Sequence, residues 1–181
     1  MNPNYAYTTR RRAPLKPLLL IGGLIVAIIA TVLLVVSLSN SEPTQQMQRL
    51  SARLTALKTI VELGDKGLQN GDLRKINSDA SILVANEQAT LDEYFAALGV
   101  AKPDKNITAL EADTATVESL NDAKLNGRLD SAYPTALSQK LDSTIALMRE
   151  IRSKTKRAAL IDQLEKSETV LASVLDQLAQ Q

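Results

Sequence analysis

An uninterrupted apolar stretch over residues 18–38 constrains the fold more than any other feature of this sequence. Its 21 residues include no charged side chain. At about 1.5 Å of rise per residue, a helix of this length spans about 31 Å, close to the roughly 30 Å thickness of the hydrocarbon core of a bilayer. The stretch therefore predicts a transmembrane helix, with a short basic tail before it and about 140 residues of helical pattern after it.

Two other interpretations of this stretch stay open at the level of sequence. A cleaved signal peptide would account for Ser37 and Ser39 as small residues before a cut, but its apolar region usually has only about 7–15 residues. The Arg11-Arg12 pair resembles a twin-arginine export signal, although Pro14 stands where such signals carry a bulky apolar residue. A lipoprotein anchor is excluded because the chain has no cysteine. We therefore expect residues 18–38 to be retained as an anchor.

The distribution of basic residues predicts the orientation of this anchor. Arg10, Arg11, Arg12 and Lys16 precede the span, whereas only Arg49 and Arg53 follow it closely. Basic residues favour the cytoplasmic side, so residues 1–17 should form a disordered cytoplasmic tail that rests against anionic headgroups. The remainder of the chain should lie outside the cytoplasm, and the lack of cysteine favours a bacterial envelope.

Small residues recur at every fourth position inside the predicted span, at Gly23, Ala27 and Thr31. This spacing places them on one helix face, where they would allow two membrane helices to approach closely. Glycine and alanine are also common in ordinary membrane helices, so self-association of the chain through this face is a hypothesis.

The composition after the span limits the possible functions. Without the four tail cations, 17 basic residues stand against 20 acidic ones, so nothing in the charge favours binding to nucleic acid. The chain has neither histidine nor cysteine, which removes the commonest general base, the thiolate nucleophile and the usual zinc and haem ligands. Carboxylates such as Asp92-Glu93 and Glu111 with Asp113 are spaced so that they do not share a helix face, and we interpret them as solvated surface. We therefore expect that the protein is not an enzyme and that it binds no cofactor.

Apolar residues three and four positions apart predict helices over residues 44–181, after a linker over 39–43. The first begins near Pro43 and extends at least to Leu63, and the second runs from about Asp72 to Leu98, where Gly99 ends it. The register of the second helix places Glu87 on the inner face, and we expect it at the rim or paired with a basic side chain.

The remaining sequence predicts three further helices. The third covers about Asp104–Leu125 and has the weakest apolar stripe, the fourth begins near Tyr133-Pro134, and the fifth covers about Lys156–Leu178. In this scheme Pro43, Pro103 and Pro134 all stand at helix starts and none stands inside a helix.

Short connections between such helices favour an antiparallel, up-and-down bundle of four or five helices, so the predicted class is all-α. A different assembly, in which the first and fifth helices form coiled-coil contacts between chains, would leave more apolar surface exposed in each chain. We expect a bundle that is closed within one chain. Association of such bundles into a homo-oligomer stays open.

Alternating helix directions would bring two turns to the membrane-proximal end of the bundle. Their basic residues are Lys102, Lys105, Arg149, Arg152, Lys154, Lys156 and Arg157. We hypothesise that they form a basic surface that rests on anionic headgroups or on an acidic partner. The alternative is that these turns are charged only because they are solvated.

Two functions without catalysis are compatible with this architecture. The first is a scaffold or protein-interaction module that binds another envelope protein. The second is a ligand-sensing bundle that passes its state to a separate membrane partner, because no apolar run after Leu38 approaches the length of a second span. The short cytoplasmic tail cannot serve as an output domain, so the interaction module is the preferred interpretation.

Overall fold

Residues 42–181 are the part of the chain that the computed structural model describes, and every regular element in this part is an α-helix. The predicted all-α class is therefore confirmed for these residues. The helices are α2 (Thr44–Asp65), α3 (Gly71–Ala97), α4 (Lys105–Glu111), α5 (Thr114–Leu125), α6 (Leu129–Lys154) and α7 (Ala158–Leu178).

The predicted anchor over residues 18–38 lies outside the described residues. The same holds for its packing face, Gly23, Ala27 and Thr31, and for the topology determinants Arg10, Arg11, Arg12 and Lys16. From residue 42 onward, the structure contains no helix that combines the length and the apolar composition needed to cross a membrane.

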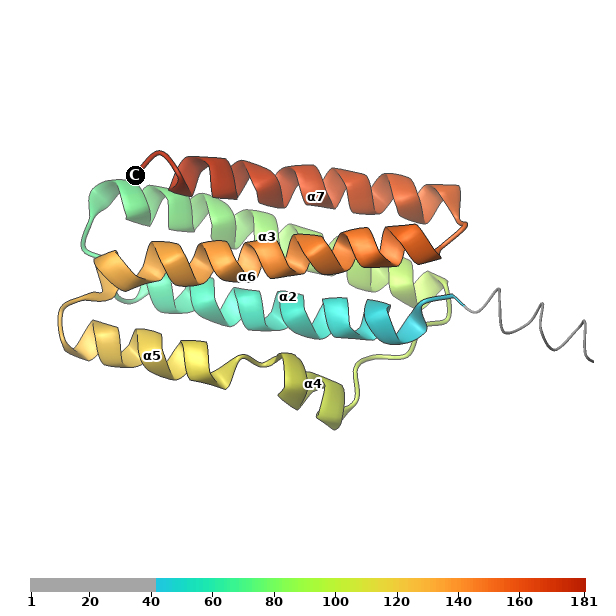
Figure 1. The fold of residues 1–181 in the computed structure, drawn as a ribbon, viewed down its shortest axis with the longest axis horizontal. Coiled ribbons are helices and arrows are strands. Elements are labelled where there is room, and N and C mark those ends of the chain that lie inside the picture. Colours follow the sequence, from blue (N-terminus) through green and yellow to red (C-terminus); the bar gives the residue numbers. More distant parts are fainter. Residues whose placement is uncertain (1–41) are drawn as a thin grey trace, which may run out of the picture. The chain divides into compact units, whose positions relative to one another are not determined.

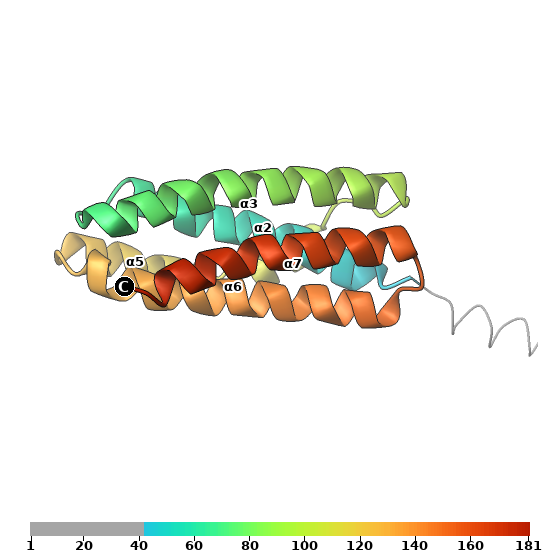
Figure 2. The same ribbon diagram turned by 90° about the horizontal axis from the view of Figure 1, so that it is seen from above.

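The helices form a bundle in which successive long segments alternate in direction (Figure 1). α2 packs beside α3 and α6, and α7 completes the ring because it also contacts α3 and α6 (Figure 2). The short helices α4 and α5 follow one another along α2 and α6. The described bundle thus has four long helices, and α4 and α5 together occupy the place of a fifth.

The core of this bundle is built from the predicted apolar stripes. On α2, the fully buried residues include Met47, Leu50, Leu54, Leu57 and Val61. On α7, they include Leu160, Leu164, Leu171 and Val174. Because the stripes of the first and last helices are covered within one chain, the bundle is closed without a partner on these faces.

Glycine ends two of the helices, and the sequence predicts the first of these ends, at Gly99. Gly99 has φ +77°, and the N–H groups of Gly99 and Val100 donate to the carbonyl groups of Ala96 and Phe95 at 3.0 and 2.9 Å. This Schellman arrangement requires a left-handed residue, which glycine adopts without a steric penalty. Gly127, with φ +66°, ends α5 in the same way.

The predicted position of Pro134 at a helix start is wrong. α6 begins at Leu129, and Pro134 lies inside the helix, where its missing N–H removes one intrahelical hydrogen bond. Burial offsets this loss, since Leu129 and Tyr133 are only 3% and 1% exposed. Asp130 adds a polar contact by accepting hydrogen bonds from the N–H groups of residues 69 and 70, both at 2.9 Å. Tertiary contacts thus extend the helix by a turn before the proline.

The prediction of a single third helix over 104–125 is also wrong, because this segment forms two helices, α4 and α5, with a short interruption between them. Asp113 stands at the break with φ 54° and ψ 44°, a left-handed conformation that aspartate adopts more readily than most residues. Leu110, which the sequence assigned to an apolar stripe, is 71% exposed, whereas Glu111 is buried. A buried ionic contact, described below, therefore sets the orientation of α4.

A buried polar network closes the end of the bundle opposite Glu42. The side-chain amide of Asn77 on α3 donates to the carbonyl of Val61 at 3.0 Å and to the carboxylate of Asp65 at 2.5 Å. Its amide oxygen accepts a hydrogen bond from the hydroxyl of Tyr133 on α6. Burial raises the pKa of Tyr133, and the charge of Asp65 raises it further, so the phenol stays protonated. Gly64 allows this close packing because a Cβ there would lie 2.6 Å from Asn77.

Candidate binding groove

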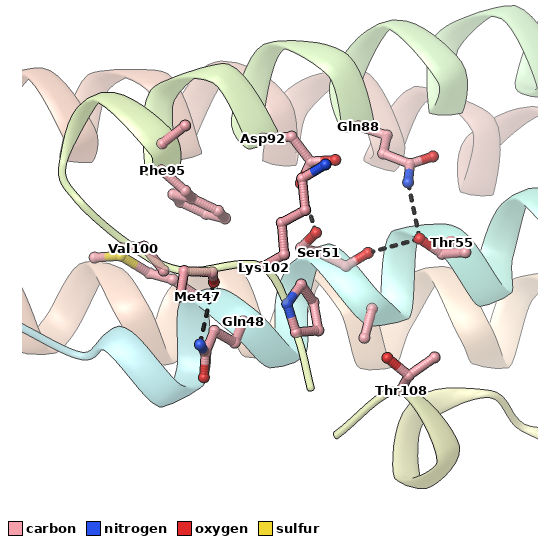
Figure 3. A pocket seen from close by; sticks show the side chains of 14 residues that line it. Met47, Gln48, Ser51, Thr55, Gln88, Asp92, Phe95, Val100, Lys102 and Thr108 are labelled. Atoms are coloured by element: carbon pink, nitrogen blue, oxygen red, sulfur yellow. Dashed lines mark hydrogen bonds between the residues drawn. The ribbon is translucent and has the colours of Figure 1, made fainter. Parts of the chain in front are cut away.

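A cavity of 410 Å³ opens between α2, α3 and the linker that leads from α3 into α4 (Figure 3). We call it the groove. It lies at the end of the bundle where α2 begins, which we call the entry end and which also holds the turn between α6 and α7 (Figure 1). Its volume falls within the range of about 300–1,000 Å³ that is typical of ligand pockets.

Apolar side chains form the floor of the groove. Met47 and Ala52 come from α2 and Phe95 from α3, and all three are at least 95% buried. Val100, just after the glycine that ends α3, adds a partly buried side chain. The only phenylalanine in the chain is thus placed in this floor. Such a floor can cover an apolar group of up to side-chain size.

A chain of hydrogen-bonded polar groups forms one wall. The hydroxyl of Ser51 donates to the carboxylate of Asp92 at 2.5 Å, and the amide of Gln88 donates to the hydroxyl of Thr55 at 2.8 Å (Figure 3). The hydroxyl of Thr55 in turn donates to the carbonyl of Ser51 at 3.1 Å. These bonds hold Asp92 and Gln88 of α3 against α2.

Asp92 provides the negative charge of the groove. One of its oxygens accepts the Ser51 hydrogen bond, and in residues 42–181 its carboxylate forms no ion pair. Lys102 also lines the cavity, and it extends from the linker across the mouth so that its ammonium group overlaps Asp92 in the view of Figure 3, but the two form no ion pair. A half-buried carboxylate that forms no ion pair can accept a contact from a positively charged partner. Asp92 is thus partly exposed, as the interpretation of a solvated carboxylate implies, but it faces an open cavity between two helices.

Beside the groove, two arginines of α2 hold the end of α4. Arg49 Nε lies 2.6 Å from Glu111 Oε1, and Arg53 Nη2 lies 2.6 Å from Glu111 Oε2. We call these three residues the ionic clamp. Burial raises the pKa of the Glu111 carboxyl, but the hydrogen bonds and charges of the two arginines lower it more, so its pKa lies below the ordinary value. Glu111 is 4% exposed, which overturns the prediction of a solvated carboxylate.

A third cation extends this contact to α6. Lys140 Nζ lies 3.2 Å from the carboxylate of Asp113 and donates to the carbonyl of Glu111 at 3.3 Å. Burial raises the pKa of Asp113, and hydrogen bonds from Thr116 and Lys140 together with the lysine charge lower it more, to a value below the ordinary one. The left-handed residue between α4 and α5 is thus fixed to the bundle by charge.

The basic residues predicted at the entry end are for the most part matched by carboxylates. The ion pairs are Arg149 with Glu168, Arg152 with Glu165 and Glu168, Lys154 with Glu150, and Arg157 with Glu42. Lys102 and Lys105 are exposed, and Lys156 lies in the turn between α6 and α7. These pairs reduce the net positive charge that this end presents, so binding to anionic headgroups stays a prediction.

Glu87, which the sequence placed on the inner face, is half-buried and accepts a hydrogen bond from the hydroxyl of Ser167 on α7. Its half-buried position agrees with the expected place at the rim, and its partner is a hydroxyl group instead of a basic side chain. In the described part of the chain, no group of three or more acidic side chains is placed to hold a metal ion.

Sequence reasoning missed both the groove and the ionic clamp. Ser51, Thr55 and Gln88 are ordinary polar positions beside apolar stripes, and no local motif marks them. Comparisons of this chain with protein-family models, with curated proteins and with solved structures gave no match.

Proposed function

We propose that the chain is a single-pass, membrane-anchored helical bundle that binds a partner protein of the cell envelope and catalyses no reaction. Residues 18–38 would form the anchor, with the N-terminus in the cytoplasm and residues 42–181 outside it. The uncharged composition of residues 18–38 and the four basic residues before them support this orientation. The lack of histidine and cysteine supports binding over catalysis.

The groove is the observation that carries this proposal. Its apolar floor lies beside Asp92, whose carboxylate forms no ion pair in the described residues although Lys102 lines the same cavity. A lysine or arginine side chain with apolar neighbours would match both features, since its stem packs on apolar surface while its charged end reaches the carboxylate. We infer that the groove accepts an exposed partner segment with this composition.

Short synthetic peptides test this binding. Full-length protein in nanodiscs of zwitterionic lipid is titrated with fluorescent peptides that carry one central lysine between leucines, and with matched peptides that carry glutamate instead. Lysine peptides should bind, glutamate peptides should not, and Asp92→Asn should weaken binding by about 10–100-fold because a hydrogen bond to a charged group is worth about 1.5–3 kcal/mol.

The matched control is Asp79→Asn, which removes an exposed carboxylate from the same helix, α3, without touching the groove. It should leave the affinity unchanged. Equal affinity of the two variants, or equal binding of lysine and glutamate peptides, would refute the role of Asp92. The absence of binding by every peptide would refute the proposed protein partner.

The size of the groove favours a second candidate function, the sensing of a small ligand. A volume of 410 Å³ suits a compact organic cation as well as a side chain. Phenethylamine is a suitable probe, and phenylpropionate is its anionic control. Binding of phenethylamine that depends on Asp92, with no binding of any peptide, would favour sensing over scaffolding.

The proposed location has its own test. Protease added to intact spheroplasts should digest residues 42–181 and leave an epitope tag on residues 1–17 intact. Digestion only after the cells are broken open would refute the proposed orientation.

A further inference from the structure

The attachment of α4 to the bundle differs from that of every other helix from residue 42 onward. Its only buried residue is Glu111, and of its two large apolar residues Leu110 is 71% exposed and Ile107 is half-buried. By contrast, α5 buries Leu120 and Ala123, and the four long helices bury apolar stripes. The one fully buried contact of α4 is therefore ionic, and its apolar contact is limited to the half-buried Ile107.

The geometry of the ionic clamp suits two states: a closed one in which Glu111 contacts both arginines, and an open one in which the separated charges are hydrated. Both oxygens of Glu111 are engaged by guanidinium groups at 2.6 Å, and Arg53 is held in turn because it donates to the carbonyl of Ser143 at 2.7 Å. When such a contact opens, water hydrates the separated charges and recovers much of the lost interaction. Opening α4 therefore exposes less apolar surface than opening any of the long helices, and the apolar surface that it uncovers is the floor of the groove.

Two unusual backbone positions delimit the segment that this clamp holds. Gly99 has φ +77° at one end and Asp113 has φ 54° at the other. We call residues 99–113 the strap. Beyond Asp113 the chain is anchored again through Leu120, which is 1% exposed. The strap can thus change its position without disturbing α3 or α5.

The strap also forms one wall of the groove. Ala101, Lys102, Pro103 and Thr108 line the cavity, and the amide of Gln48 on α2 donates to the carbonyl of Ala101 at 3.1 Å. Any movement of the strap away from α2 removes this wall. Access to the apolar floor therefore depends on the position of the strap.

We propose that residues 99–113 are a movable strap over the groove and that Glu111, held by Arg49 and Arg53, is its latch. Release of the latch opens the groove, and an occupant of the groove competes with the closed strap. The consequence for ligands rests on the proposed binding function, whereas the movement of the strap does not. Buried ion pairs add little net stability, because the cost of removing the charges from water offsets much of their attraction, and a segment held by them can therefore be controlled.

Amide hydrogen exchange of the full-length protein in nanodiscs tests the latch. Glu111→Gln removes the charge and keeps the shape, so amides in residues 104–111 should exchange at least about tenfold faster, while those of the four long helices keep their rates. Glu118→Gln is the matched control, because Glu118 is exposed on α5 and forms no ion pair in the described residues. Unchanged exchange in Glu111→Gln, or equal acceleration of all helices, would overturn the proposal.

Arg49→Gln provides a milder variant if Glu111→Gln does not fold. Arg49 is 33% exposed, and its loss leaves the Arg53 contact in place. The same amides should exchange faster, by a smaller factor than in Glu111→Gln. Unchanged exchange in this variant would also count against the latch.

A thiol in the groove tests the opening itself. The chain has no cysteine, so Ala52→Cys introduces a single thiol on the groove floor at a position that is 5% exposed. A maleimide should label it at least about tenfold faster when Glu111→Gln is also present, and no faster with Glu118→Gln. This readout needs no ligand. Unchanged labelling would refute the strap even if peptides bind, and faster labelling without peptide binding would refute only the proposed function.

Discussion

Tyr133→Phe provides a sharp test of the packing at the end of the bundle opposite the groove. The substitution removes one hydroxyl group and keeps the ring, which is 1% exposed and fixed between helices. The amide oxygen of Asn77 then loses its donor, and Asn77 is fully buried, so water cannot replace the hydrogen bond. The amide hydrogens of Asn77 stay bound to Val61 and Asp65, so the side chain cannot rotate to satisfy its oxygen without breaking those bonds.

The expected loss follows from this geometry. A buried acceptor without a donor lowers the free energy of unfolding by about 1–3 kcal/mol, and no cavity term is added because the ring remains. For a domain of this size, each kcal/mol lowers the melting temperature by about 2–4 °C, so a loss of about 2 kcal/mol corresponds to about 4–8 °C. The effect should appear in the midpoint of unfolding and not in the amount of helix.

Thermal and urea unfolding, followed by circular dichroism, measure this loss. Tyr94→Phe is the matched control, because Tyr94 is half-buried and its hydroxyl forms no hydrogen bond in the described residues. It should change the free energy of unfolding by less than about 0.5 kcal/mol. Equal stability of Tyr133→Phe and Tyr94→Phe would refute the view that the network stabilises the bundle.

Three further predictions concern the same helical bundle. Gly64→Ala should destabilise it by about 1–3 kcal/mol in urea unfolding, because a Cβ would lie 2.6 Å from Asn77 and 2.8 Å from Tyr133, whereas Gly71→Ala, with open space around it, should be neutral or slightly stabilising. Burial raises the pKa of Tyr133, so the neutral phenol makes its full contribution to the free energy of unfolding below about pH 10, and this contribution is lost as the pH rises further. The unfolding midpoints of the native protein and Tyr133→Phe should therefore converge in alkali. Because its arginine partners hold the pKa of Glu111 below 4.5, its contribution is present above that pH and is lost as the pH falls through the lowered value. The protection factors of the α4 amides, which are exchange rates corrected for the intrinsic slowing of exchange in acid, should then fall, and constant protection factors down to pH 2 would contradict this.

The long helices could be predicted from the sequence because their signals are local. Apolar residues at spacings of three and four define α2, α3 and α7, and Gly99 marks a helix end through its own backbone preference. The start of α6 could not be predicted in this way. Pro134 is a strong local signal, but the burial of Leu129 and Tyr133 against distant segments outweighs it.

The groove and the ionic clamp could not be predicted from the sequence. Ser51 and Asp92 are 41 positions apart, and Arg49 and Glu111 are 62 positions apart. Nothing in their immediate neighbours distinguishes them from solvated polar residues. Whether a carboxylate is exposed or buried depends on what another helix places beside it, which periodicity within one helix does not contain.

The helical class, the apolar stretch that predicts an anchor, and the lack of histidine and cysteine all follow from composition and from spacing along the chain. The tertiary structure alone decided which polar residues meet, where the third helix breaks and where a cavity remains. The physical reason is that hydrogen bonds and ion pairs depend on distances of a few ångströms, and only packing sets those distances between residues far apart in the sequence.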